Sequence, residues 1–137
     1  MKVLVLDAWA IMVWLKGQQP AADRARALLE AADRQECRLT MNIVNVGEVF
    51  YLSAKARNIA YGERVLRTLQ SRLETISAND ELVMLAAALK AKYAISYADG
   101  FAAATAILHD APLVTGDPEI RTMAAAEKAL QLEWIGR

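Results

Sequence analysis

Four acidic residues stand in settings that suit the binding of a metal ion. Asp7 directly follows the apolar run VLVL, and Asp117 follows LVTG. Asp99 lies near the start of SYADGFAAATAIL, and Glu48 lies inside NIVNVGEVFYLSAK. Clustered oxygen ligands suit Mg²⁺ or Mn²⁺, whereas zinc prefers His or Cys. If the four carboxylates converge, the chemistry they predict is the binding of a divalent cation.

Three of these acids also have an ordinary structural explanation. Aspartate at the position of Asp7 caps a helix by accepting a bond from an unpaired N–H group. Asp117 begins the sequence Asp-Pro-Glu, a favourable helix start with Pro118 in the first turn. Ser96 and Asp99 have the spacing of a capping box, with aspartate in place of the usual glutamate. Taken one at a time, these residues fit a cap as well as a functional site.

Glu48 is the least ordinary of the four acids. The positions three and four residues away, on the same face of a helix, are Val44, Asn45, Tyr51 and Leu52. A glutamate on such a largely apolar face is partly desolvated, which is costly unless a cation or a hydrogen-bond donor meets it. A salt bridge to a basic residue elsewhere in the chain is the alternative explanation.

The combination of acids carries more weight than any single one. Two carboxylates about 4 Å apart repel by roughly 4 kcal/mol at an effective dielectric constant of 20, so a cluster requires a compensating cation. The chain has one histidine, His109, near an expected helix end, where it suits the last carbonyl groups better than a metal. Cys37 is the only cysteine, which excludes an internal disulfide and a cysteine-based zinc site. The predicted ligands are therefore carboxylates.

The elements that must position these acids alternate along the chain. Five short apolar runs are expected to be strands, and longer stretches with helical periodicity separate them. The expected strands are Val3 to Leu6, Arg38 to Met41, Glu74 to Ser77, Leu113 to Thr115, and Leu132 to Ile135. This alternation predicts a three-layer α/β/α fold around a parallel five-stranded sheet, in a single domain spanning residues 1–137. Ligands of such sheets bind beyond the carboxyl ends of the strands.

The composition fits this fold and limits the functional classes. The 137 residues are 55% hydrophobic, with 16 basic and 16 acidic side chains, so the bulk positive charge of many nucleic-acid-binding proteins is absent. No apolar run is long enough to predict a membrane span. The opening MKVLVLDAWAIMVWLKG superficially resembles a signal peptide, but Asp7 interrupts it and no small-residue cleavage site follows. We therefore expect a cytoplasmic protein.

The order VLVLDAWA, NVGEVFY, SYADGFAAATA and LVTGDPEI resembles the PIN domain, particularly the VapC-type toxins of prokaryotic toxin–antitoxin pairs. The resemblance spans essentially the whole chain and matches the four acidic positions of the family in order. It implies a metal-dependent endoribonuclease that uses Mg²⁺ or Mn²⁺. Asp7 and Asp99 would be the principal ligands, and Asp117 would bind directly or through water.

The resemblance implies further roles and partners. Glu48 would be a ligand or would position the attacking water, and Asn45 and Thr115 match polar positions near the family's site. The implied partners are an RNA substrate, a small antitoxin protein and a second copy of the chain. The segment AWAIMVWLK, which carries Trp9 and Trp14, is apolar on nearly every side. Such a helix is either fully buried or lined by another chain, and we expect it to contribute to a protein-binding groove.

Three other interpretations compete with a nuclease. A catalytically inert PIN-like module would bind protein or RNA without cutting it, although such a module would have no need to retain the four acidic residues. A phosphoacceptor receiver domain needs adjacent acids after the first strand, where this chain has Leu6 before Asp7. A haloacid-dehalogenase-type phosphatase needs a second aspartate two residues after the first, where this chain has Trp9. The inert module remains the main alternative.

Overall fold

The computed structural model describes residues 1–137 and contains one five-stranded sheet in which every strand pair is parallel. The strand order is β3-β2-β1-β4-β5, so β1 lies at the centre. The strands are β1 (Lys2–Leu6), β2 (Cys37–Asn42), β3 (Glu74–Ile76), β4 (Leu113–Thr115) and β5 (Leu132–Trp134). The five strands expected from the sequence are confirmed and differ from the expectation only at their ends.

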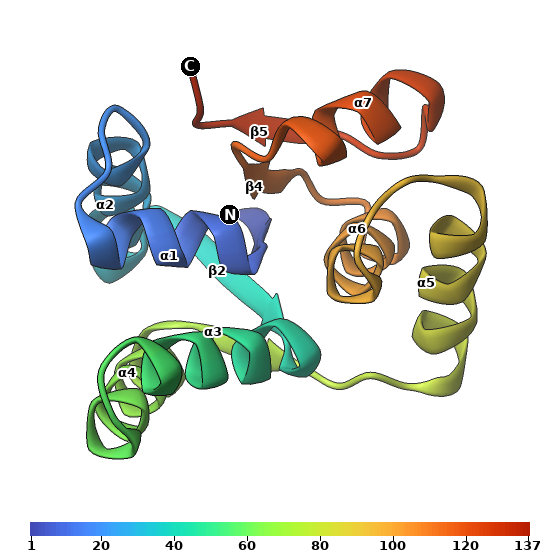
Figure 1. Ribbon diagram of the computed structural model, residues 1–137. Coiled ribbons are helices and arrows are strands. Elements are labelled where there is room, and N and C mark those ends of the chain that lie inside the picture. The colour runs from blue at the N-terminus through green and yellow to red at the C-terminus, as the bar shows by residue number, and fades with distance from the viewer.

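Seven helices cover the two faces of this sheet (Figure 1). They are α1 (Ala8–Lys16), α2 (Ala21–Asp33), α3 (Ile43–Ala56), α4 (Ile59–Arg72), α5 (Asp80–Lys92), α6 (Tyr97–Leu108) and α7 (Pro118–Ala126). Helices α1 to α4 pack into one hydrophobic cluster, and α5 to α7 pack into a second one. The expected three-layer α/β/α arrangement is therefore confirmed.

The two clusters are separated by the alternation of side chains along the strands. In β1, Leu4 and Leu6 belong to the cluster on the α1 side, whereas Val5 belongs to the cluster on the α6 side. In β4, Val114 and Leu113 divide in the same way. A central strand with both faces covered must be apolar at successive positions, which explains the run VLVL.

Short polar side chains begin most of the helices. Asn42, Asn58, Asn79 and Ser96 each accept a hydrogen bond from a backbone N–H in the first turn of α3, α4, α5 and α6, respectively. Such caps satisfy N–H groups that have no partner within the helix. Helix α5 has Lys90 and Lys92 in its last turn, where positive charges interact favourably with the helix dipole.

Helix α6 is buried along most of its length, as its small residues suggested. The seven residues from Gly100 to Ala106 are all buried. A Cβ atom at Gly100 would lie 2.9 Å from the carbonyl oxygen of Ala86, so glycine permits the close approach of α5. Because α6 is held this tightly, the residues of its first turn, including Asp99, have a fixed position.

Helix α1 is partly exposed. Trp9 and Trp14 are both partly buried and pack against the cluster on their side of the sheet. The alternative in which both indoles are fully buried is therefore wrong, and α1 has surface left for other contacts. No helix in the chain combines the length and the apolar character that crossing a membrane requires.

Candidate functional site

Three of the four predicted acids line a single cavity of about 250 Å³. These residues are Glu48, Asp99 and Asp117, and we call this cavity the acidic pocket. Glu48 lies on α3, Asp99 lies in the first turn of α6, and Asp117 is the residue that caps α7. The remaining lining residues are Ala8, Trp9, Met12, Lys16, Leu52 and Ser96. The pocket lies beyond the carboxyl ends of β1 and β4, where ligands of parallel sheets bind.

Asp7, the fourth acid, has no exposed surface. Its Oδ1 accepts a hydrogen bond of 2.9 Å from the N–H of Ala10, which caps α1. Its Oδ2 is buried without any hydrogen-bond partner. The pKa of Asp7 is raised to about 8, mainly by burial and further by the charges of Asp99 and Asp117, although the Thr115 hydroxyl and the Ala10 N–H partly offset the rise. Asp7 therefore belongs electrostatically to the acidic pocket.

Glu48 and Asp99 are affected in the same direction. Burial raises the pKa of Glu48, and the charge of Asp99 raises it further. Burial likewise raises the pKa of Asp99, with a further increase from the charge of Asp117. Glu48 Oε1 is buried without a hydrogen-bond partner, and none of the ion pairs in the chain includes Glu48. The salt bridge that would have explained Glu48 by structure alone is therefore not formed.

The capping explanations of the aspartates also hold, and they do not compete with a cluster. Asp117 Oδ1 accepts a 2.9 Å hydrogen bond from the N–H of Glu119, and the N–H of Asp99 donates to Ser96 Oγ at 3.1 Å. Asp7 and Asp117 each accept a backbone hydrogen bond with one carboxylate oxygen. Asp99 contributes its backbone N–H, not its carboxylate, to the bond with Ser96. Each acid thus keeps an oxygen for another contact while its helix start fixes its position.

The two polar residues that were expected near the site border it. Thr115 is fully buried, and its Oγ1 accepts a 3.1 Å hydrogen bond from the N–H of Asp117. Asn45 is 1% exposed and donates to the carbonyl oxygen of Ala98 at 2.9 Å. Asn45 also lowers the pKa of Glu48, against the larger effect of burial. Both side chains thus connect the acids to the surrounding backbone.

The donor set of the acidic pocket fits a hard divalent cation. No group of three or more Asp, Glu, His or Cys side chains is arranged so that it could hold a metal ion as it stands. Mg²⁺, however, is usually held by one or two carboxylates and keeps several of its water ligands. Asp7 and Glu48 have unpaired buried oxygens, and the acids of the cluster raise one another's pKa, so their ionised forms are unfavourable without a cation; such a cation would stabilise the ionised carboxylates in place of protons.

Lys16 is the residue of this pocket that the sequence analysis missed. It is the one basic side chain among the lining residues, and it forms no ion pair in the chain. Trp9, Met12 and Lys16 are spaced by three and four residues on α1, so they share the helix face that lines the pocket. This spacing after Asp7 was a signal that could have identified Lys16.

His109 and Cys37 take the structural roles that were expected for them. The Nδ1 atom of His109 lies 2.9 Å from the carbonyl oxygen of Thr105, in the last turn of α6. Cys37 is buried in the hydrophobic cluster on the α1 side of the sheet. Neither residue lines the acidic pocket.

Comparison with known proteins gives one family and a consistent fold. The family model of the PIN domain matches residues 4–126. No curated protein matches the sequence. Among solved structures, one that aligns with this chain is VapBC2 from Rickettsia felis bound to a DNA fragment from its promoter. The alignment has a TM-score of 0.71 and 19% identity, and it covers 96% of this chain and 97% of that chain.

Two further solved structures have the same fold. The DNA-bound VapBC from Salmonella typhimurium aligns with a TM-score of 0.71 and 16% identity, over 97% of this chain and 98% of that chain. VapC20 from Mycobacterium tuberculosis, described as a sarcin-ricin loop cleaving toxin, aligns with a TM-score of 0.69 and 12% identity, over 91% and 95%. At sequence identities this low, the comparisons show only that these proteins share the fold of this chain.

Proposed function

The chain belongs to the PIN domain family, and from this premise we propose that it is a metal-dependent endoribonuclease that hydrolyses RNA phosphodiester bonds. The observation that carries the proposal is the meeting of four carboxylates at one edge of the sheet, with unpaired buried oxygens on Asp7 and Glu48. A purely structural cluster would be expected to pair these oxygens with donors, because an unpaired buried polar atom costs free energy. A site that binds a cation leaves them open.

The proposed ligands are Asp7, Asp99 and Asp117, with Mg²⁺ or Mn²⁺ as the metal. When bound, such an ion lowers the pKa of a coordinated water and stabilises charge on the phosphoryl oxygens. Asp7 and Asp99 would hold the ion, and Asp117 would bind it directly or through water. The cap hydrogen bonds of Asp7 and Asp117 keep these carboxylates oriented before the substrate arrives.

Two further residues of the acidic pocket act on the substrate and the water. Glu48, with its unpaired Oε1, orients the attacking water by accepting a hydrogen bond from it or contacts the ion. Asn45 and Thr115 hold Glu48 and Asp117 in position. Lys16, at the edge of the same pocket, donates to a phosphate oxygen of the RNA.

We further propose that the chain is the toxin of a type II toxin–antitoxin pair. The likeness in fold to VapBC complexes supports this assignment. A second cavity of about 300 Å³ lies between α1 and α4, and we call it the helix groove; its lining residues are Trp14, Leu15, Tyr61, Arg64, Val65, Thr68 and Leu69. Its apolar floor suits an amphipathic segment of an antitoxin, which would cover Trp14.

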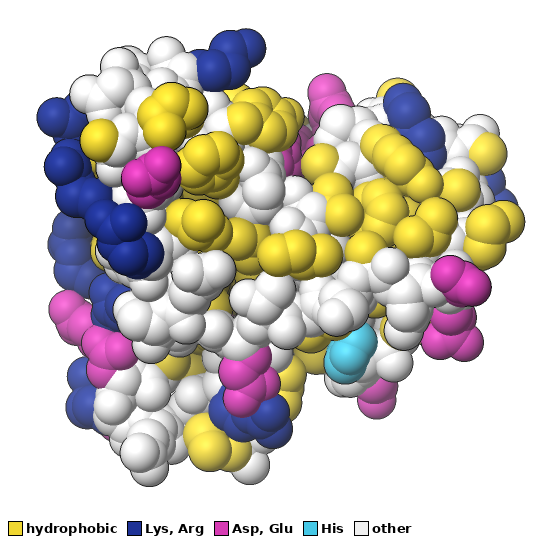
Figure 2. Space-filling view, turned by 90° about the horizontal axis from the view of Figure 1, so that it is seen from below, with side chains coloured by type: hydrophobic (Ala, Val, Ile, Leu, Met, Phe, Trp, Pro, Cys, Tyr) yellow, Lys and Arg dark blue, Asp and Glu magenta, His cyan; other side chains and the backbone are white.

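A second copy of the chain is the other proposed partner. On the face formed by α3, α5 and α6, hydrophobic side chains gather over much of the surface (Figure 2). The large apolar residues exposed on these helices include Ile43, Tyr51, Met84 and Tyr97. Exposed apolar patches of this kind mark protein interfaces, so we assign this face to a homodimer.

The test is to express the wild type and Asp7→Asn briefly in a bacterial host and to map new RNA 5′ ends across the transcriptome. Asparagine keeps the shape of the side chain and its capping oxygen but removes the charge. We expect discrete new 5′ ends with the wild type and none with Asp7→Asn. Asp80→Asn, which changes an exposed carboxylate of α5 outside the acidic pocket, is the matched control and should cut like the wild type.

The other outcomes separate the alternatives. The same cleavage sites with the wild type and Asp7→Asn would mean that Asp7 is structural and that the proposed site is wrong. No cleavage by either protein, when both are folded and RNA that contains the target is present, would favour the inert PIN-like module.

A further inference from the structure

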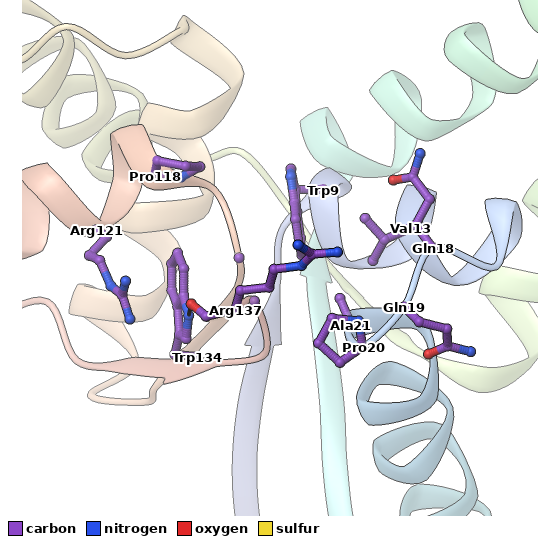
Figure 3. A pocket seen from close by; sticks show the side chains of 12 residues that line it. Trp9, Val13, Gln18, Gln19, Pro20, Ala21, Pro118, Arg121, Trp134 and Arg137 are labelled. Atoms are coloured by element: carbon purple, nitrogen blue, oxygen red, sulfur yellow. Dashed lines mark hydrogen bonds between the residues drawn. The ribbon is translucent and has the colours of Figure 1, made fainter.

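The largest cavity of the molecule adjoins the acidic pocket but has the opposite charge. It measures about 380 Å³, which falls within the usual range for small-molecule sites of roughly 300–1,000 Å³. Its lining includes Trp9, Trp134, Gln18, Gln19, Arg121 and Arg137, and no Asp or Glu side chain. We call it the indole cavity. Figure 3 shows the two indoles on either side of the space, with the side chain of Arg137 reaching across it.

Both indoles rest against backbone that has no side chain. A Cβ atom at Gly116 would overlap the ring of Trp9, and one at Gly136 would lie 2.9 Å from the ring of Trp134. The same Cβ at Gly136 would lie 3.2 Å from the Cα of Gly116, so the two glycines also adjoin each other. Glycine at these positions lets each ring pack closely on the main chain, which leaves the cavity between the two rings.

The segment that carries Trp134 is held in place by hydrogen bonds. The Nε1 of Trp134 donates to the carbonyl oxygen of Arg137 at 3.0 Å. Arg24 of α2 donates to the carbonyl oxygens of Ile135 at 3.3 Å and Gly136 at 2.5 Å. Contacts within the chain therefore fix this wall of the cavity, which lowers the entropic cost of binding a ligand.

Two guanidinium groups of the indole cavity have no acidic partner. The guanidinium of Arg121 lies 3.8 Å from the centre of the Trp134 ring, within the range of a cation–π contact. Neither Arg121 nor Arg137 forms an ion pair in the chain. Their charges are thus available to phosphate oxygens, which arginine contacts with two donors at once.

The indole cavity and the acidic pocket share one wall. Trp9 lines both, and the consecutive residues Gly116, Asp117 and Pro118 divide between them, with Asp117 facing the acidic pocket. A ligand that fills both must place one phosphate near the carboxylates and an aromatic group with a second phosphate near the arginines. A strand of RNA has this alternation of bases and phosphates.

We propose that the indole cavity binds the nucleotide next to the scissile phosphate of a single-stranded RNA, with its base stacked between Trp9 and Trp134. The phosphate of that nucleotide contacts Arg121 and Arg137. The base must be unpaired, because a base within a helix cannot be stacked on a side chain. This inference rests on the proposed nuclease function, since it assigns the indole cavity to the nucleotide beside the site of cleavage.

The three tryptophans of the chain provide the test. Trp9 and Trp134 line the indole cavity, whereas Trp14 lines the helix groove and serves as an internal control. A short single-stranded RNA of mixed sequence is titrated into the ¹⁵N-labelled protein with chelator present, and the three indole N–H signals are followed by NMR. We expect the Trp9 and Trp134 signals to shift in parallel and the Trp14 signal to remain unchanged.

A variant tests the phosphate contact. Arg121→Gln, which keeps the length of a polar side chain, is expected to weaken RNA binding roughly tenfold in fluorescence anisotropy. Arg67→Gln, at an exposed position of α4 that lines none of the three cavities, is the matched control and should bind like the wild type. A shift of Trp14 alone, no shift of any indole, or unchanged binding by Arg121→Gln would each overturn the proposal.

The outcome is separable from that of the proposed function. Cleavage that depends on Asp7, in a protein whose Trp9 and Trp134 signals do not respond to RNA, would leave the nuclease standing and remove the indole cavity from substrate binding. Shifts of both signals in a protein that cuts no RNA would support RNA binding in the indole cavity and contradict the proposed nuclease function. A partner protein that shifts Trp9 and Trp134 when RNA does not would assign the cavity to a protein ligand, against the proposal.

Discussion

The acidic pocket and the indole cavity meet at the ring of Trp9 and differ in almost every other respect. The side chains that line the first include three carboxylates and one lysine, and those that line the second include two arginines and no Asp or Glu. A phosphodiester is repelled by the first unless a cation is present, whereas the second attracts it without one. Under the proposed function, this difference corresponds to a division of roles, in which the acidic pocket carries out the chemistry and the indole cavity binds the RNA.

The two regions are also held by different means. In the acidic pocket, Asp7 and Asp117 are helix caps at the carboxyl ends of strands, so the fold itself fixes them. The indole cavity is closed by the loop between α1 and α2 on one side and by β5 and the residues after it on the other. Its shape depends on close packing of rings on Gly116 and Gly136.

The largest effect expected from this division is that of Asp99→Asn on cleavage. Removing one charge from the acidic pocket should lower kcat roughly 10²–10³-fold, as the loss of one preorganised electrostatic group does in other enzymes. RNA affinity should stay the same or increase, because a carboxylate that repels phosphate is removed. Single-turnover cleavage with Mg²⁺ and RNA binding in chelator measure the two quantities separately.

Asp80→Asn serves as the control for this experiment, because Asp80 lines neither cavity. It should leave both kcat and affinity unchanged. If Asp99→Asn weakened RNA binding as strongly as it slowed cleavage, the acidic pocket would also contribute to RNA binding. The proposed separation of catalysis and RNA binding between the two regions would then be wrong.

The next effect concerns the stability of the metal-free protein. Burial raises the pKa of Asp7 from its ordinary value of 3.8 to about 8, so the folded state retains a proton that the unfolded chain releases. Folding therefore takes up a proton between these values, and the free energy of unfolding falls as pH rises from about 4 to about 8. Above about 8 the contribution of Asp7 no longer changes.

Asp7→Asn removes this part of the pH dependence. Retaining the proton of Asp7 in the folded state costs about 1.4 kcal/mol for each pH unit above about 4, which is about 4 kcal/mol at pH 7, and the asparagine amide, buried without a partner, costs about 1–3 kcal/mol in return. We expect a net gain of about 2 kcal/mol at pH 7 in chelator, measured by urea denaturation, and a smaller gain at pH 5. Mg²⁺ should stabilise the wild type but not Asp7→Asn, and equal stabilisation of both would contradict the ligand assignment.

The difference between the acidic pocket and the indole cavity also explains which parts of the structure the sequence could predict. The strand ends and the caps made Asp7, Asp99 and Asp117 recognisable, because short-range rules place such residues at one edge of a parallel sheet. Glu48 followed from an acid on a largely apolar helical face. These rules use only neighbouring residues, and they predicted the sheet with its two covered faces for the same reason.

The indole cavity was not predictable in this way. Trp9 and Trp134 are 125 positions apart in the chain and meet only after β4 and β5 have joined the sheet. The importance of Gly116 and Gly136 lies in the ring that each one touches, which their neighbours in the sequence do not indicate. Contacts between distant segments that share no periodicity leave no local pattern, so only the folded structure shows them.

The smallest expected effect tests the wall between the two regions. Gly116→Ala places a Cβ atom where the ring of Trp9 lies, so the ring must shift toward one of the cavities. Because Trp9 is only partly buried and can move, we expect a loss of about 1 kcal/mol, at the lower end of the range for overpacking, and a Tm lower by about 3–4 °C. RNA binding in chelator should weaken by a few-fold as the indole cavity narrows.

Gly47→Ala is the matched control, because a Cβ atom at this exposed position of α3 would meet nothing within 4 Å. Alanine favours a helix over glycine by up to about 1 kcal/mol, so this variant should raise the Tm and leave RNA binding unchanged. Thermal denaturation and anisotropy measure both variants. If Gly116→Ala lost stability but bound RNA as tightly as Gly47→Ala, the Trp9 ring would support the fold alone, and the base would have to stack elsewhere.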